Sequence, residues 1–261
     1  MAGRIRFVLR LVASVIFCLV MWLYAQWVKF ITRKDMRARY RRLCGGMSFW
    51  GHGTARIFGM KIRVHGTPPE APFFLVTNHI SYTDILLLCA TCPAWFVSKA
   101  EVARWPGIGA LTRSGNTLFL DRETRRDVHR MNKIIANLVR DGGGVGFYPE
   151  GTTTDGGTIL PFKPSLLQPA VDLGIPVHAG AIAYETPPGS PPSSEWVAWI
   201  GDDEFTPHAK RLLSAPGFTA HVRFGDETVQ ADDRKALAKR AHAAVSKLHA
   251  ELLREIAAAK P

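Results

Sequence analysis

The spacing of apolar and polar residues separates one long apolar segment from a series of much shorter apolar runs. The long segment, from Leu11 to Val28, has no charged side chain, and Gln26 is its one strongly polar residue. It is just long enough for a helix that crosses the hydrocarbon core of a bilayer. Beyond residue 60, short apolar runs typical of strands alternate with stretches of helical periodicity.

The order of these shorter stretches predicts the fold class. Strands that alternate with helices indicate an α/β domain with a mixed, largely parallel sheet flanked by helices, preceded here by an N-terminal membrane-associated helical segment. In such sheets, ligand sites form where strand ends meet helix starts. We expect strands at residues 61–65, 73–77, 95–98, 117–121, 146–148, 175–184, 196–200 and 220–224, and helices at residues 47–60, 84–88, 127–140, 165–173 and 232–259.

The charge distribution supports a division of the chain into two parts. The formal net charge is +11, and residues 1–42 hold ten Lys and Arg against one acidic residue, Asp35. A basic excess beside an apolar segment favours an anionic membrane over nucleic acid as the partner. We therefore expect residues 1–60 to form a membrane anchor and basic amphipathic region, and residues 61–261 to form the α/β domain.

A cleaved signal peptide is the alternative interpretation of the N-terminus, since it also begins with basic residues and an apolar stretch. Trp22, Tyr24 and Trp27 stand where small residues would mark cleavage, and they suit an interfacial belt. The heavier positive block after the segment predicts that the globular part faces the cytoplasm at the inner membrane. The pattern leaves open whether the segment spans the bilayer or lies half-embedded beside the stretch from Met47 to Met60.

The four cysteines leave a redox or half-metal site as the weaker alternative to free thiols. Cys89 and Cys92 form a lone C-x-x-C after an apolar run, and there is no second pair. We expect buried or half-buried free thiols.

The clearest candidate for catalysis follows the strand expected at residues 73–77. Asn78 and His79 come directly after it, and Asp84 is five residues beyond the histidine. With His79 in the loop and Asp84 in the first turn of a helix, the imidazole can fold back onto the carboxylate. The other ring nitrogen is then free to accept a proton from a hydroxyl. A loop histidine beside a helix-capping aspartate is the alternative.

Two other stretches carry polar groups at strand ends. In Tyr148-Pro-Glu-Gly-Thr152, Glu150 can accept hydrogen bonds from a polyol, and Gly151 allows close approach of the backbone. Lys163 can add positive charge near this loop. Arg122 ends a predicted strand and suits bidentate contact with phosphate. An ordinary surface turn and a solvated basic cluster are the alternatives.

A covalent mechanism would need a nucleophile near His79. Ser81 lies in the same stretch, but the chain has no G-x-S-x-G, P-loop, G-x-G-x-x-G or H-E-x-x-H motif. Direct attack by an activated substrate hydroxyl is the simpler mechanism. A lipid hydrolase that uses Ser81 and a non-catalytic module that binds anionic membranes are the competing hypotheses.

Taken in order, these stretches resemble the glycerolipid acyltransferase family, and most closely the bacterial 1-acylglycerol-3-phosphate (lysophosphatidic acid) acyltransferases. That family is marked by N-H-x-x-x-x-D, G-x-x-F-x-x-R, F-P-E-G-T and an apolar strand with a proline. The matching stretches are residues 78–84, 119–122, 148–152 and 175–177.

The resemblance implies transfer of an acyl chain from acyl-CoA or acyl-carrier protein to the free hydroxyl of a lysolipid. The first-ranked acceptor is 1-acylglycerol-3-phosphate, which would give phosphatidic acid for phospholipid synthesis. His79 and Asp84 would be the catalytic residues, and the family needs no metal or other cofactor. The residues implied to bind substrate are Asn78, Arg122, Glu150, Gly151 and Thr152.

Two departures from the family pattern affect the acceptor. Gly115 stands four residues before Phe119, where the family usually has three. Thr153 stands where the family commonly has an arginine. Loss of that cation leaves room for a lysophospholipid with a larger head group or for a lyso-ornithine lipid.

Overall fold

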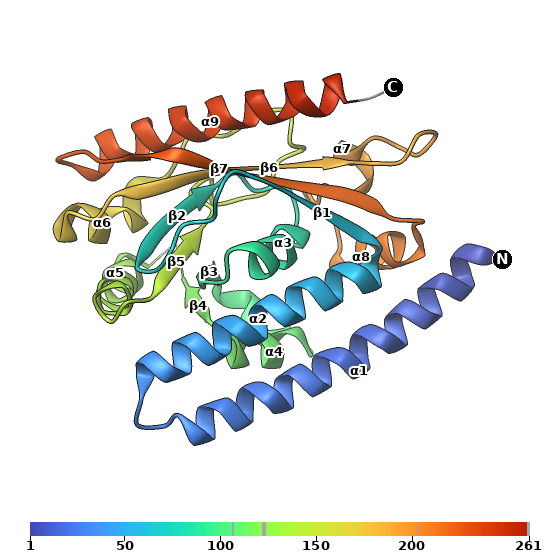
Figure 1. The fold of residues 1–261 in the computed structure, drawn as a ribbon, viewed down its shortest axis with the longest axis horizontal. Helices are drawn as coiled ribbons and strands as arrows, with labels where there is room; N and C mark the ends of the chain where they lie inside the picture. The colour runs from blue at the N-terminus through green and yellow to red at the C-terminus, as the bar shows by residue number, and fades with distance from the viewer. Residues whose placement is uncertain (106, 122–123, 202, 260–261) are drawn as a thin grey trace.

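A seven-stranded sheet runs through the middle of the protein in the computed structural model, which describes residues 1–105, 107–121, 124–201 and 203–259 (Figure 1). Helices cover both of its faces. The strands are β1 (Met60–His65), β2 (Phe73–Thr77), β3 (Trp95–Lys99), β4 (Thr117–Leu120), β5 (Gly144–Phe147), β6 (Val177–Glu185) and β7 (Phe218–Val229). The helices are α1 (Ala2–Ile31), α2 (Met36–Phe58), α3 (Thr83–Thr91), α4 (Ile108–Ser114), α5 (Arg125–Arg140), α6 (Gln168–Leu173), α7 (Ser193–Trp196), α8 (Phe205–Ser214) and α9 (Arg234–Ala258), with 3-10 turns at Ala100–Arg104 and Pro164–Leu166.

The topology confirms the predicted fold class. The strand order is β1-β7-β6-β2-β5-β3-β4. Neighbouring strands run parallel except β6 and β7, which pair antiparallel. Strands β5, β2 and β6 are adjacent at the centre, so their carboxyl ends open at one edge of the sheet. Ligand sites in α/β sheets form at such an edge.

Successive residues of β2 serve two separate cores, which explains why this strand is apolar throughout. Phe73 and Leu75 belong to the core beneath α2, α3 and α8. Phe74 and Val76 belong to the core beneath α5, α6 and α9. In Figure 1, α9 accordingly lies on the opposite side of the sheet from α2 and α3. A strand that is buried on both faces is apolar at successive positions and does not alternate between apolar and polar residues.

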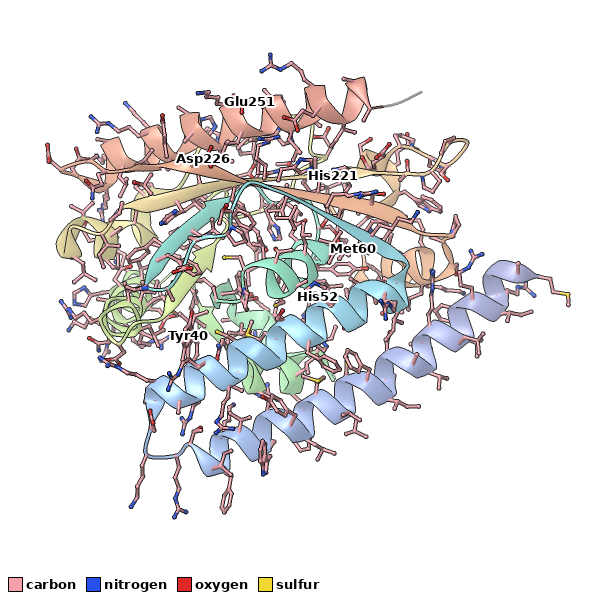
Figure 2. All side chains as sticks on the ribbon, in the orientation of Figure 1. Tyr40, His52, Met60, His221, Asp226 and Glu251 are labelled. Carbon is pink, nitrogen blue, oxygen red and sulfur yellow. The ribbon has the colours of Figure 1, made fainter. Side chains whose placement is uncertain are left out.

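Helix α1 packs along α2, and its outer side is apolar and exposed. The rings of Phe17 and Tyr24 lie where β-carbons would stand on Gly53 and Gly46 of α2, so these glycines allow the close approach. The outer side chains of α1 point away from the rest of the protein (Figure 2). They include Val8, Leu11, Val12, Val15, Ile16, Leu19, Leu23 and Trp27. Within the described residues, α1 is the one helix long and apolar enough to cross a membrane.

Both ends of α1 are hydrogen-bonded to the α/β domain. Near its start, Arg6 donates to the carbonyl oxygen of Ser214 at 2.9 Å, and Arg10 donates to that of Ala215 at 2.6 Å. Near its end, Lys29 donates to the carbonyl oxygen of Arg113 at 2.9 Å. Helix α1 therefore lies along the domain over most of its length.

Helix α2 begins well before the predicted start at Met47. Asp35 caps it, because its carboxylate accepts a hydrogen bond from the backbone N–H of Ala38 at 2.8 Å. The basic residues from Arg37 to Arg42, which precede the predicted helix start, therefore lie in the first half of α2. Tyr40, labelled in Figure 2, joins this half to the sheet by accepting a hydrogen bond from the Gly144 N–H at 2.6 Å.

The strand predicted at residues 196–200 is wrong, and the short helices α4 and α8 were not predicted. Trp196 ends α7, and the backbone N–H of Val197 donates to the carbonyl oxygen of Ser193. The carbonyl oxygen of Ala198 accepts from His208 of α8 at 3.0 Å. Val197 and Ala198 are apolar because they are buried against α8, a contact that a local pattern cannot distinguish from a strand.

Gly51→Ala should destabilise the protein, because α2 and α3 meet there. A β-carbon at Gly51 would lie 2.5 Å from the backbone nitrogen of Ala90 and 2.8 Å from the carbonyl oxygen of Leu86. Both are backbone atoms of α3, so the helices would have to separate, at a cost of about 1–3 kcal/mol. The matched control is Gly45→Ala in the same helix, which meets no atom within 4 Å and should raise stability through helix propensity. Thermal unfolding compares the two, and equal melting temperatures would contradict this packing.

Candidate active site

His79 and Asp84 form a hydrogen-bonded pair at the carboxyl edge of the sheet. His79 follows the end of β2, and Asp84 lies in the first turn of α3. His79 Nδ1 is 2.7 Å from Asp84 Oδ2. The His79 side chain is 18 % exposed, whereas that of Asp84 is fully buried. Among the described residues, His79 Nε2 has no hydrogen-bond partner, so this nitrogen is open to a substrate hydroxyl.

Four donors surround the carboxylate of Asp84 within the described part of the chain. Besides His79, Oδ2 accepts from the backbone N–H groups of Ile80 at 2.7 Å and Ser81 at 3.1 Å. Oδ1 accepts from the hydroxyl of Tyr184 at 2.6 Å. These donors compensate the carboxylate for the loss of water. With Asp84 Oδ2 as the acceptor, the ring hydrogen of a neutral His79 lies on Nδ1, which leaves the lone pair of Nε2 free for a substrate proton.

Tyr148 holds the imidazole from one face. Its ring stacks on that of His79 with centroids 3.9 Å apart and planes 11° from parallel. The stack and the bond to Asp84 together fix the direction in which Nε2 points. Ser81, by contrast, is fully buried, and its Oγ has no partner among the residues that the structure describes. His79 therefore does not activate Ser81, and the geometry gives no support to a serine nucleophile.

The carboxylate of Glu150 joins two loops by hydrogen bonds. Its Oε1 accepts from the backbone N–H of His79 at 2.7 Å, and its Oε2 accepts from that of Leu160 at 2.8 Å. Burial raises the pKa of the Glu150 carboxyl, and the two amide hydrogen bonds oppose that shift. Each oxygen thus already has a backbone donor, so the structure shows a positioning role. Contact between Glu150 and the acceptor stays a prediction.

Asn78 extends the pairing of β2 with β6 by one residue. Its Nδ2 donates to the carbonyl oxygen of Ile182 at 3.0 Å, and its Oδ1 accepts from the N–H of Ile182 at 2.7 Å. The side chain is buried. Asn78 therefore fixes where the strand ends and the catalytic loop begins, and its predicted contact with substrate is untested.

The turn after Glu150 is shaped by a glycine. Gly151 has a φ of 78°, in the left-handed region that favours glycine, and the side chain of Lys163 crosses it. A β-carbon on Gly151 would lie 2.8 Å from Lys163 Nζ, which places an exposed cation at this turn. Thr152 is exposed beside it. Arg122, the other predicted cation, lies outside the described residues.

Thr153 and Thr154 use their polar groups within the protein. The hydroxyl of Thr153 donates to the carbonyl oxygen of Trp199. The backbone N–H of Thr154 donates to the carbonyl oxygen of His79 at 2.9 Å. Thr153, which stands where the family commonly has an arginine, therefore bonds to the loop around Trp199, and the neighbouring Thr154 bonds to the catalytic loop.

An apolar cavity lies between α1, α2, α3 and α4. Ile85, the residue after Asp84, and Cys89 line it from α3. Met21 of α1, Met47 and Trp50 of α2, and Leu111 of α4 complete its walls. The four cysteines are free, as predicted. No group of three His, Cys, Asp or Glu side chains within the described ranges is arranged to hold a metal ion.

Tyr184 was not predicted as a site residue. It lies 100 residues from Asp84, and only the placement of β6 beside β2 brings the two together. A tyrosine near the end of an apolar strand carries no signal that separates this role from ordinary packing.

The amino-acid sequence of this chain is similar to those of known acyltransferases. A family model described as Acyltransferase matches residues 61–183. The lyso-ornithine lipid O-acyltransferase of Pseudomonas aeruginosa is 35 % identical over 78 % of this chain and 74 % of its own length. That of Brucella abortus is 36 % identical over 74 % of this chain and 77 % of its own. The 1-acyl-sn-glycerol-3-phosphate acyltransferase of Neisseria meningitidis serogroup B is 30 % identical over 72 % and 74 %.

A solved structure shares the fold. The crystal structure of the 1-acyl-sn-glycerophosphate acyltransferase PlsC from Thermotoga maritima superposes with a TM-score of 0.65, at 22 % identity, over 94 % of this chain and 97 % of that one. The sequence matches extend over most of the chain and therefore show more than a shared fold. This chain belongs to the acyltransferase family, and it is an acyltransferase that acts on lysolipids.

Proposed function

We propose that this enzyme transfers an acyl chain from a thioester donor to the free hydroxyl of a lyso-ornithine lipid, with His79 as general base. The observation that carries the mechanism is the His79–Asp84 pair with Nε2 open at the sheet edge. The acceptor is supported by the 35–36 % identity to lyso-ornithine lipid acyltransferases and by Thr153. The sequence motifs alone rank 1-acylglycerol-3-phosphate first.

The chemistry is a direct acyl transfer. His79 Nε2 takes the proton of the acceptor hydroxyl as its oxygen attacks the thioester carbonyl. The tetrahedral intermediate then collapses, the carbon–sulfur bond breaks, and the thiolate leaves with the proton returned by the imidazolium. Asp84 stabilises that imidazolium and keeps the ring in place. The products are an ester and a free thiol, and the step uses no metal or prosthetic group. Acyl-CoA and acyl-carrier protein are both donors of the required kind.

A second candidate acceptor is 1-acylglycerol-3-phosphate, which would give phosphatidic acid in phospholipid synthesis. It is favoured by the 30 % identity to the Neisseria meningitidis enzyme and by Lys163, an exposed cation at the Gly151 turn. Against it stands Thr153, whose hydroxyl is bonded within the protein and which carries no charge for a phosphomonoester.

The apolar cavity beside α3 suits the hydrocarbon chain of a substrate. Ile85, the residue after Asp84 in α3, lines it together with side chains of α1 and α2. Because α1 and α2 also carry exposed apolar side chains, a chain leaving the bilayer would enter the cavity without crossing water.

The enzyme associates with membranes through α1, which we place in one leaflet of the inner membrane with the catalytic domain on the cytoplasmic side. Arg10 and Lys29 both contact the domain, and they are about 28 Å apart along a helix that rises 1.5 Å per residue. That separation is close to the thickness of the hydrocarbon core, about 30 Å. A spanning helix would carry one end away from the domain, and these contacts therefore support our proposal that α1 lies along the membrane surface.

His79→Ala should lower the rate of thiol release with acyl-CoA and lysolipid by roughly 100-fold to 10,000-fold, because the general base is lost. Asp84→Asn should cost less, since Asp84 orients His79 and transfers no proton. The assay uses detergent-solubilised full-length enzyme, and mass spectrometry identifies the product. His52→Ala, which changes an exposed histidine of α2, is the matched control. Equal rates for wild type and His79→Ala would refute the mechanism.

Thr153→Arg should raise kcat/KM for 1-acylglycerol-3-phosphate relative to lyso-ornithine lipid by about tenfold or more, because a guanidinium would pair with the phosphate. Thr153→Val is the control, since it removes the hydrogen bond to Trp199 without adding charge. If wild type already prefers 1-acylglycerol-3-phosphate, the proposed acceptor is wrong. If both variants change the ratio equally, charge at this position does not select the head group.

Epitope tags at the two ends of the chain test the placement of α1. In inverted inner-membrane vesicles, protease should remove the N-terminal and C-terminal tags alike without detergent. Full-length enzyme with a central tag in an exposed loop, at Gly189, reports the side of the domain. Protection of the N-terminal tag alone would show that α1 spans the bilayer.

A further inference from the structure

Tyr184 is joined to the catalytic pair although it comes from a distant strand. It lies near the end of β6, and it is 7 % exposed. Its hydroxyl donates to Asp84 Oδ1 at 2.6 Å. The other carboxylate oxygen, Oδ2, accepts the bonds from His79 and from two backbone amides. Among the residues that the structure describes, Tyr184 is thus the one hydrogen-bond donor to Oδ1.

A second hydroxyl sets the direction of this bond. Thr83 Oγ1 donates to the hydroxyl oxygen of Tyr184 at 2.9 Å, and Thr83 is itself fully buried. Because Thr83 donates, the hydrogen of Tyr184 is directed at Asp84. Burial raises the pKa of the Tyr184 phenol well above its ordinary value, and the neighbouring Asp84 adds to the shift. The phenol therefore stays protonated, and remains a hydrogen-bond donor, over the neutral pH range of an activity assay.

We infer that Tyr184 is a positioning residue for acyl transfer, which holds the Asp84 carboxylate in the rotamer that faces His79. The inference rests on the proposed function of His79 and Asp84. Without the phenol, Oδ1 is a buried carboxylate oxygen with no donor in the described ranges of the chain, and such an oxygen is costly to keep unpaired. The carboxylate then gains by turning or by drawing in water, and either change moves the partner of His79 Nδ1.

The inference predicts that loss of the Tyr184 hydroxyl changes kcat more than it changes KM. Tyr184→Phe removes one oxygen and keeps the ring that packs against Phe218. It should lower kcat by roughly tenfold to 100-fold, the range expected from the loss of a hydrogen bond to a charged group. The KM values for donor and acceptor should change little, because the side chain of Tyr184 is buried and its hydroxyl is bonded to Thr83 and Asp84. The acid-side midpoint of the kcat/KM profile should move to higher pH, because a carboxylate that has lost one hydrogen-bond donor interacts more strongly with the protonated imidazole of the catalytic base.

Two other variants separate positioning from simple loss of stability. Tyr40→Phe also removes one bonded phenol hydroxyl, but that hydroxyl holds Gly144 and lies away from Asp84. It should lower the melting temperature while leaving kcat and the pH profile unchanged. Thr83→Val removes the hydroxyl that donates to Tyr184, and it should shift the pH profile in the same direction as Tyr184→Phe but by less. Thr83→Ser keeps a hydroxyl at this position and should give the wild-type profile.

The experiment measures kcat, KM, pH profile and melting temperature for full-length wild type and these variants with one acyl-CoA and one accepted lysolipid. Tyr184→Phe combined with Asp84→Asn should add little to Asp84→Asn alone, since the two residues act through one contact. An unchanged pH profile for Tyr184→Phe, or equal effects of Tyr184→Phe and Tyr40→Phe, would overturn the inference. If Tyr184→Phe does not fold, Thr83→Val without any shift of the profile would overturn it.

His79→Ala, measured in the same series, separates this inference from the proposed function. An active His79→Ala refutes the general-base mechanism and the positioning role with it. An inactive His79→Ala together with a fully active Tyr184→Phe refutes only the role of Tyr184.

Discussion

The structure around the active site depends on one buried charge, the carboxylate of Asp84. A carboxylate removed from water must be surrounded by donors, and here it receives them from the His79 ring, two loop amides and Tyr184. These donors come from the loop after β2 and from β6, and the carboxylate itself comes from α3. Satisfying Asp84 therefore requires that these elements be assembled correctly. The same requirement orients His79, so the stability of the site and its chemistry share one set of contacts.

The surrounding polar residues serve the geometry of this loop more than they serve a ligand. Asn78 ends β2 by pairing with Ile182, and Glu150 holds the His79 backbone from the opposite side. Thr154 bonds to the carbonyl oxygen of His79. The family motifs imply substrate binding for several of these residues, but in this chain their polar atoms are taken by the backbone. Within the described site, the side chains open to solvent are those of Thr152, Lys163 and, in part, His79.

Two helices with exposed apolar side chains, α1 and α2, pack on the same side of the sheet as α3. Helix α1 buries a narrow side against α2 and the domain and leaves a wide apolar side exposed, which water would oppose and a bilayer accepts. The cavity beside Ile85 lies beneath these same helices. The hydrogen-bond network of Asp84 and the lining of the apolar cavity therefore come within one turn of α3 of each other. Asp84 faces the loop while the next residue faces the cavity.

The sequence by itself determined the fold class, strand β2 with its correct bounds, and the likeness of the Asn78–Asp84 stretch to a general-base motif. These features are local: a buried strand is a continuous apolar run, and the histidine and aspartate lie in one loop and the turn after it. It did not determine the structure at residues 196–200, since burial against α8 produces the same apolar run as a strand. Only the tertiary structure decided that Tyr184 is bonded to Asp84 and that Glu150 holds the backbone of His79. Those contacts join residues far apart in the chain, and they exist because β5, β2 and β6 are neighbours in the sheet.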